Sequence, residues 1–110
     1  MPFIADQKDR WWGQNLYIEY FGGAAPVQAW GTIRGYQFYF RSRHKHWSFA
    51  VALTPDIDPA DICFPDQGFY REELYDGKSN SASYMPEDEA EAIIQHCAAA
   101  FIQRVSASNG

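Results

Sequence analysis

Residues 34–53 (RGYQFYFRSRHKHWSFAVAL) constrain the fold more than any other stretch, because aromatic and polar residues alternate on both sides of a basic cluster. An alternation with a period of two places neighbouring side chains on opposite faces of a β-strand. The stretch therefore predicts a β-hairpin whose arms are residues 36–41 and 47–53 and whose basic tip is residues 42–46. Ahead of it, Arg34-Gly35 predicts a tight turn, since glycine accepts a positive φ.

Three further segments also have the pattern of strands, namely residues 15–21, 27–33 and 69–75. In the first of them, Leu16, Ile18 and Tyr20 are expected to share one face. The last mixes apolar and charged residues in a way that suits the edge of a sheet. With the hairpin they predict four to five antiparallel strands in meander order.

The C-terminal region predicts one long helix over residues 86–105. Pro86 suits the first helical position, and the acids that follow it place negative charge at the positive end of the helix dipole. Residues 106–110 are expected to fray. One apolar stripe with three- and four-residue spacing should cover the sheet: Ala90, Ile93, Ile94, Cys97, Phe101 and Val105.

The sequence leaves open which face of the sheet this helix covers. The second arm of the hairpin carries large apolar residues on one side, from Trp47 to Leu53. Its other side carries only Ser48, Ala50 and Ala52, which would let a helix pack closely. Both arrangements are compatible with the pattern.

These elements predict a single α+β domain over residues 1–110, an antiparallel sheet of four to five strands with one long C-terminal helix packed on one face. A chain of 110 residues is long enough for one sizeable core. We expect residues 1–14 to be irregular and residues 76–85 to form a polar loop. Asp58 and Pro59 suit the N-cap and first position of a short helical turn.

The net charge of −5 is unevenly distributed. Residues 34–53 contain four bases and no acid, whereas residues 54–91 contain eleven acids and two bases. A negative total argues against a nucleic-acid partner, which requires a positive field. The uneven distribution favours a protein partner of complementary charge, either a second copy of this chain or a basic protein that it binds as an inhibitor or immunity protein would.

The signals for cellular location are few. The first residues, MPFIADQKDRWW, lack the features of a signal peptide, and no stretch approaches ~18 consecutive apolar residues. Cys63 and Cys97 have no CxxC spacing, and Cys97 falls on the apolar stripe of the helix, which favours two buried thiols over one disulfide. We therefore expect a cytoplasmic protein of bacterial style with no membrane partner.

The basic tip is the main candidate binding site. His44 and His46 are two residues apart, so on a strand both imidazoles would point the same way. Two histidines do not complete a metal site, and no metal or cofactor is expected. Trp12 is added because the adjacent Trp11 and Trp12 cannot both face one side of a strand, which leaves one ring for the surface or a partner. The favoured alternative is that both rings fold over the open end of the core. The candidate residues are Arg41, Arg43, His44, Lys45, His46 and Trp12.

No motif supports an enzyme, since GxSxG, HExxH and a phosphate-binding glycine loop are all missing from the sequence. Residues 34–40 match the RNA-recognition signature only in part, because Gln37 and Tyr39 depart from it and no helix precedes the strand. We expect non-catalytic protein–protein interaction, as a homodimer or with a basic partner. The alternative is binding of a small ligand or single-stranded nucleic acid through residues 34–53.

Overall fold

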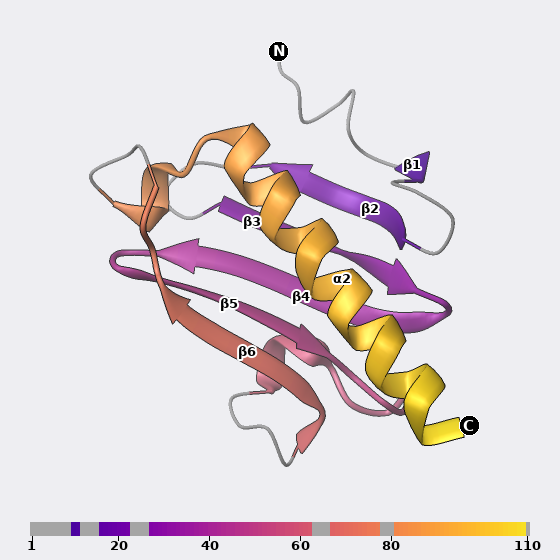
Figure 1. Ribbon diagram of the computed structural model, residues 1–110. Helices are drawn as coiled ribbons and strands as arrows, with labels where there is room; N and C mark the ends of the chain where they lie inside the picture. Colours follow the sequence, from indigo (N-terminus) through magenta and orange to yellow (C-terminus); the bar gives the residue numbers. More distant parts are fainter. Residues whose placement is uncertain (1–9, 12–15, 23–26, 63–66, 78–80, 110) are drawn as a thin grey trace.

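The computed structural model describes residues 10–11, 16–22, 27–62, 67–77 and 81–109 (Figure 1). One antiparallel sheet runs through these residues, and each strand pairs with the next strand along the chain. Its strands are β1 (Arg10–Trp11), β2 (Leu16–Gly22), β3 (Val27–Ile33), β4 (Tyr36–Arg43), β5 (His46–Val51) and β6 (Phe69–Leu74). The 3-10 turn η1 (Pro59–Asp61) precedes β6 in the chain. The 3-10 turn η3 (Ala82–Tyr84) and the helix α2 (Glu87–Asn109) follow β6.

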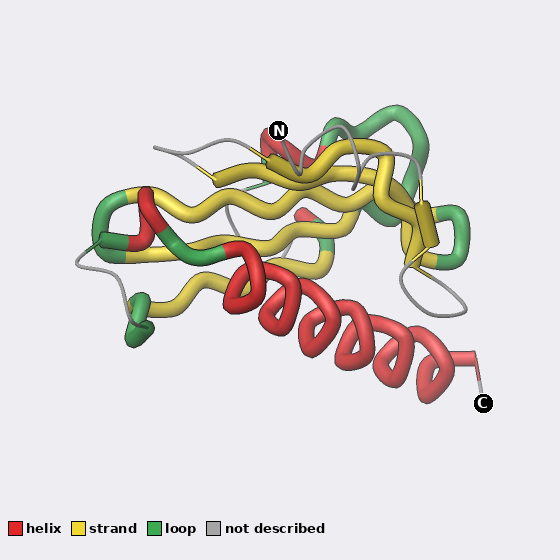
Figure 2. Tube along the Cα trace, turned by 90° about the horizontal axis from the view of Figure 1, so that it is seen from above, coloured by secondary structure: helices red, strands yellow, loops and turns green. Residues whose placement is uncertain are grey.

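The predicted α+β class is confirmed, with a meander sheet and one C-terminal helix across one of its faces (Figure 2). The short strand β1 lies within the segment expected to be irregular, where Arg10 pairs with Ile18. The helix begins at Glu87, one residue after the predicted start. It continues to Asn109, so the prediction that the chain frays from residue 106 is wrong for residues 106–109.

The core lies between α2 and the large-residue face of the sheet, which answers the question that the sequence left open. Phe38, Phe40 and Phe49 are fully buried on this face. Phe101 of the helix packs edge to face against Phe69 of β6, with ring centroids 5.4 Å apart. Large rings fill the space between helix and sheet better than the small residues of the opposite face would, because a close-packed core leaves few voids. The opposite face of the sheet is therefore not covered by the helix.

A β-bulge in β2 changes which side chains face the core. The register between β2 and β3 shifts between Ile18 and Tyr20. Beyond this irregularity Phe21 is fully buried, while Tyr20 is only half-buried and stacks on Trp30. The prediction that Tyr20 shares the face of Leu16 and Ile18 is therefore wrong, because an inserted residue inverts the alternation.

The tip of the hairpin β4–β5 is tighter than predicted and is tied to the segment before the helix. The two strands extend to Arg43 and His46, so the turn is only His44–Lys45, and His44 has a φ of 58°. The backbone N–H of His44 donates to Ser83 Oγ at 2.9 Å, and the carbonyl of His44 accepts from the N–H of Ala82 at 2.7 Å. The end of the predicted polar loop is therefore a 3-10 turn fastened to the hairpin.

The other end of β5 is shorter than expected. The strand ends at Val51, and Leu53, which was predicted to continue it, is 52% exposed. The predicted helical turn at residues 58–62 is present as η1, with Asp58 as N-cap and Pro59 at the first position. The predicted edge strand is β6.

Gly31 supplies the first test of this fold. A Cβ at Gly31 would lie 2.0 Å from the carbonyl oxygen of Tyr17, because β2 approaches β3 closely beside the bulge. We expect Gly31→Ala to lower the free energy of unfolding by about 3 kcal/mol, since backbone atoms must move to admit the methyl group. Urea denaturation of the purified variant measures this change.

Gly35→Asn is the matched control. Gly35 has a φ of 88° in the turn between β3 and β4, and a Cβ there would meet no atom within 4 Å. Asparagine is one of the residues that best tolerate a left-handed conformation, so backbone strain should lower the free energy of unfolding by only about 1 kcal/mol. Equal effects of the two substitutions would contradict the close approach of the backbones at Gly31.

Candidate ligand site on the open sheet face

The face of the sheet opposite α2 is only partly covered. Over β5, the small residues Ala50 and Ala52 are buried beneath Ile62, and Ile57 packs against the same cluster. The chain segment around η1 thus covers the side of the sheet nearest β5. Over β2, β3 and β4, the described residues that face away from the helix are half-buried or exposed. We call this uncovered area the open face.

Three aromatic rings cross the open face from strand to strand. Tyr20 pairs with Trp30 on β3, and Trp30 pairs with Tyr39 on β4. The rings of Tyr20 and Trp30 stack with centroids 4.4 Å apart and planes 19° apart. Trp30 and Tyr39 are 6.4 Å apart with an angle of 27°. Because the three rings are neighbours across the strands and nearly parallel, they form a continuous aromatic surface.

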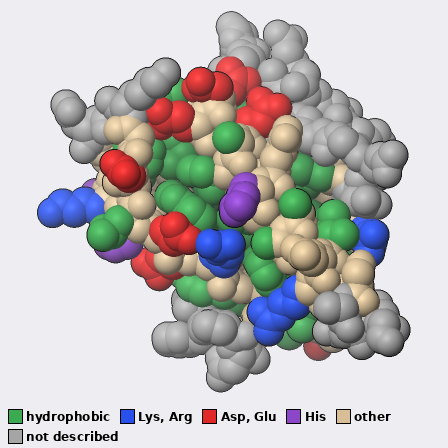
Figure 3. Space-filling view, in the orientation of Figure 1, with side chains coloured by type: hydrophobic (Ala, Val, Ile, Leu, Met, Phe, Trp, Pro, Cys, Tyr) green, Lys and Arg blue, Asp and Glu red, His purple; other side chains and the backbone are tan. Residues whose placement is uncertain are grey.

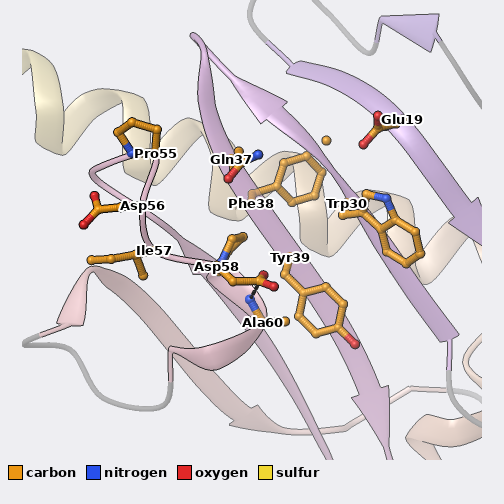
Figure 4. A pocket seen from close by; sticks show the side chains of 12 residues that line it. Glu19, Trp30, Gln37, Phe38, Tyr39, Pro55, Asp56, Ile57, Asp58 and Ala60 are labelled. Atoms are coloured by element: carbon orange, nitrogen blue, oxygen red, sulfur yellow. Dashed lines mark hydrogen bonds between the residues drawn. The ribbon is translucent and has the colours of Figure 1, made fainter.

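A hollow of about 530 Å³ lies beside two of these rings. Figure 4 shows Trp30 and Tyr39 side by side along one side of the hollow and the chain segment from Pro55 to Ala60 along the other. Within this segment the Asp58 carboxylate caps η1 by accepting a hydrogen bond from the N–H of Ala60 at 2.9 Å. The polar side chains that line the hollow are mostly acceptors: Glu19, Gln37, Asp56 and Asp58.

Burial and hydrogen bonding shift the pKa values of two groups that line the hollow. Burial raises the pKa of Tyr39, an effect that Arg41 partly opposes and that Asp58 reinforces. The phenol therefore stays protonated at neutral pH and can donate a hydrogen bond. A hydrogen bond from the Thr54 side chain is the main reason that the pKa of Asp56 is lowered, so this carboxylate is an ionised acceptor.

The structure brings together only part of the predicted basic site. Arg41, Arg43 and His46 line a smaller hollow of about 160 Å³ on the open face, together with Ser48. His44 and Lys45 form the turn of the hairpin, whereas His46 is the first residue of β5, so the two histidines do not share a strand. Trp12 lies outside the described residues.

Sequence reasoning missed the aromatic surface and the acidic hollow. Trp30 and Tyr39 had a signal, since each alternates with the apolar residues of its strand. Tyr20 did not, because the bulge is not visible in the alternation. Asp58 was identified only as a helix cap, and its place beside Tyr39 depends on how residues 54–62 fold over the sheet.

The described residues contain no group of three or more histidine, cysteine, aspartate or glutamate side chains that would hold a metal ion. Within the same residues, no helix is long and apolar enough to cross a membrane. Comparison with models of known protein families, with curated proteins and with solved structures found no match.

Cys97 is a buried thiol, which makes it a poor nucleophile. It lies on α2 in the core between helix and sheet, it is not in a disulfide, and burial raises its pKa to about 12. Cys63 lies outside the described residues.

We expect Cys97 to resist alkylation at pH 8, because the thiolate is the reactive form and the folded protein disfavours it. In a Cys63→Ser background, the folded protein should react with iodoacetamide at least ~100-fold more slowly than the chain in denaturant. Mass spectrometry of timed samples measures both rates. A folded rate close to the unfolded one would contradict the burial of this side chain.

Proposed function

We propose that the open face binds a nucleoside, with the base stacked on the rings of Trp30 and Tyr39. The observation that carries this proposal is the pair of nearly parallel rings at the side of a hollow of about 530 Å³. Pockets for small ligands typically measure about 300–1,000 Å³. Stacking on an aromatic side chain contributes about 1–3 kcal/mol per base and tolerates every base, because each has a flat π face.

The polar lining of the hollow supports the same ligand class. Asp56 and Asp58 offer carboxylate oxygens, and Gln37 offers an amide. A nucleoside presents matching donors, namely the hydroxyl groups of its ribose and the exocyclic amino group of adenine, cytosine or guanine. A hollow rich in acceptors therefore suits a ring that carries donors.

A single nucleoside suits the charges better than a long nucleic-acid strand. Three of the four acceptor residues of the hollow are acids, and the chain has a net charge of −5. Binding along a polyanion would bring many phosphates near this field without the release of counterions that normally favours it. The proposal keeps the small-ligand function for the hairpin of residues 34–53 and adds Trp30 of β3 to it.

The proposal predicts the effects of removing single rings. Trp30→Ala and Tyr39→Ala should each weaken adenosine binding about 10-fold or more, since each removes a stacking partner. Isothermal titration calorimetry with adenosine measures this loss. Tyr84→Ala is the matched control, because Tyr84 is a tyrosine that is 64% exposed and does not line the hollow; its adenosine affinity should be unchanged.

Two results would overturn the proposal. The first is the absence of adenosine binding at millimolar concentration. The second is binding that both ring variants retain in full. Maltose serves as a comparison ligand, because a sugar also offers hydroxyl donors but has no aromatic face; binding of maltose in place of adenosine would contradict the nucleoside.

A homodimer is the second candidate function, and one end of the molecule favours it. A hollow of about 410 Å³ opens between the end of β6 and the start of α2, lined by apolar and acidic residues that include Leu74, Ile93, Glu73 and Asp76. Leu74 is 67% exposed and pairs with His46, so this surface adjoins the basic turn. Figure 3 views this side, where a basic side chain projects at the tip of hairpin β4–β5, at the left edge. Neighbouring patches of opposite charge suit a two-fold contact, which brings each patch against its complement.

Light scattering tests the homodimer. The mass of the dimer should be found at low salt and should fall towards that of the monomer at high salt, because screening weakens attraction between exposed charges. Leu74→Glu should give a monomer at both salt concentrations. Leu53→Glu is the matched control, since Leu53 is also an exposed leucine but lies beyond the other end of β5. A wild-type protein that is monomeric under all conditions would remove this candidate.

A further inference from the structure

Four polar side chains on the open face form a second site beside the aromatic rings. Arg41 and Arg43 are two residues apart on β4, so both point to the open face. Their partners on β5 are Ser48, opposite Arg41, and His46, opposite Arg43. All four line the hollow of about 160 Å³. We call Arg41, Arg43, His46 and Ser48 the basic quartet.

One atom of the half-buried Arg41 side chain lacks a hydrogen-bond partner. Its Nε is buried and has no hydrogen-bond partner among the described residues. Within the same part of the chain, no carboxylate oxygen lies within 4.0 Å of a side-chain nitrogen of Arg41 or Arg43. A buried donor without an acceptor costs free energy, and an anion in the hollow would supply the acceptor.

The groups that face the quartet leave a positive balance. From β6, Glu72 lines the same hollow, and its carboxylate accepts a hydrogen bond from the Tyr70 hydroxyl at 3.0 Å. Two guanidinium groups therefore face one carboxylate. Arginine binds phosphate well, because its planar group can donate two parallel hydrogen bonds to phosphate oxygens. The hydroxyl of Ser48 adds a further donor.

The quartet lies at the right place for a phosphate attached to the stacked nucleoside. Tyr39 and Arg41 are two residues apart on the same face of β4, which corresponds to roughly 7 Å along a strand. A base on Tyr39 and a phosphate at Arg41 can thus belong to one molecule. We infer that the ligand of the open face is a nucleoside monophosphate, whose phosphate binds the basic quartet. This inference rests on the proposed nucleoside site.

Comparison of AMP with adenosine by calorimetry at low salt tests the inference. AMP should bind about 10-fold or more tightly than adenosine, because charge-assisted hydrogen bonds to phosphate are among the strong ones. Arg41→Gln should reduce AMP affinity to the level of adenosine and leave adenosine affinity unchanged. Glu72→Gln should raise AMP affinity, since it removes the negative charge that faces the phosphate.

Lys45→Gln is the matched control for the loss of one positive charge. Lys45 lies in the turn next to the quartet but does not line its hollow, so AMP affinity should stay close to that of the wild type. The melting temperature of each variant shows that it is folded. If Lys45→Gln weakens AMP binding as much as Arg41→Gln does, AMP is attracted by the overall positive charge of the region, and the quartet is not a specific phosphate site.

The outcomes separate the inference from the proposal on which it rests. Adenosine binding that is weakened by Trp30→Ala, with no gain for AMP, would overturn the phosphate site alone. Binding of neither compound would overturn the nucleoside site. In that case inorganic phosphate, titrated while amide NMR signals of β4 and β5 are followed, tests the quartet by itself: shifts that disappear in Arg41→Gln support an anion site, and their absence overturns it.

Discussion

The packing of α2 on the large-residue face of the sheet is the interaction on which the rest of the structure depends. Phe38, Phe40 and Phe49 are buried between sheet and helix, where Phe101 completes the core. Each such ring removes a large apolar area from water, and burial of apolar area is the main favourable term in folding. Because the strands alternate, the residues between these rings must point the other way. The open face is therefore a direct result of how the core is filled.

The sequence predicted the elements whose signal is periodic and local. The alternation in residues 36–41 and 47–53 identified the hairpin, and the apolar stripe from Ala90 to Val105 identified the helix. The sequence did not predict the position of Tyr20, because the bulge shifts the pairing of β2 with β3 and leaves no mark on the alternation of residue types along β2. The sequence also did not determine which face of the sheet the helix covers, since the residues of β5 alone would allow a core on either face.

The candidate site was harder to predict than the fold. Arg41, Arg43 and His46 were identified as a basic group from the hairpin alone, because their spacing within two adjacent strands is local. The aromatic surface needs three strands in register, and the acidic hollow needs residues 54–62 to fold back over β4 and β5. Contacts of this kind depend on tertiary packing. Periodicity within one strand carries no information about them.

The hydrogen bonds between His44 and the segment Ala82–Tyr84 have a consequence for the order of folding. Strands β2 to β6 pair in sequence order, so each contact within the sheet can form through a short or moderate chain closure. The contact of His44 with Ala82 and Ser83 joins residues far apart in the chain and needs a completed β4–β5 turn to dock on. The helix follows directly after this contact. We therefore expect α2 to dock on the sheet after the β4–β5 turn has formed.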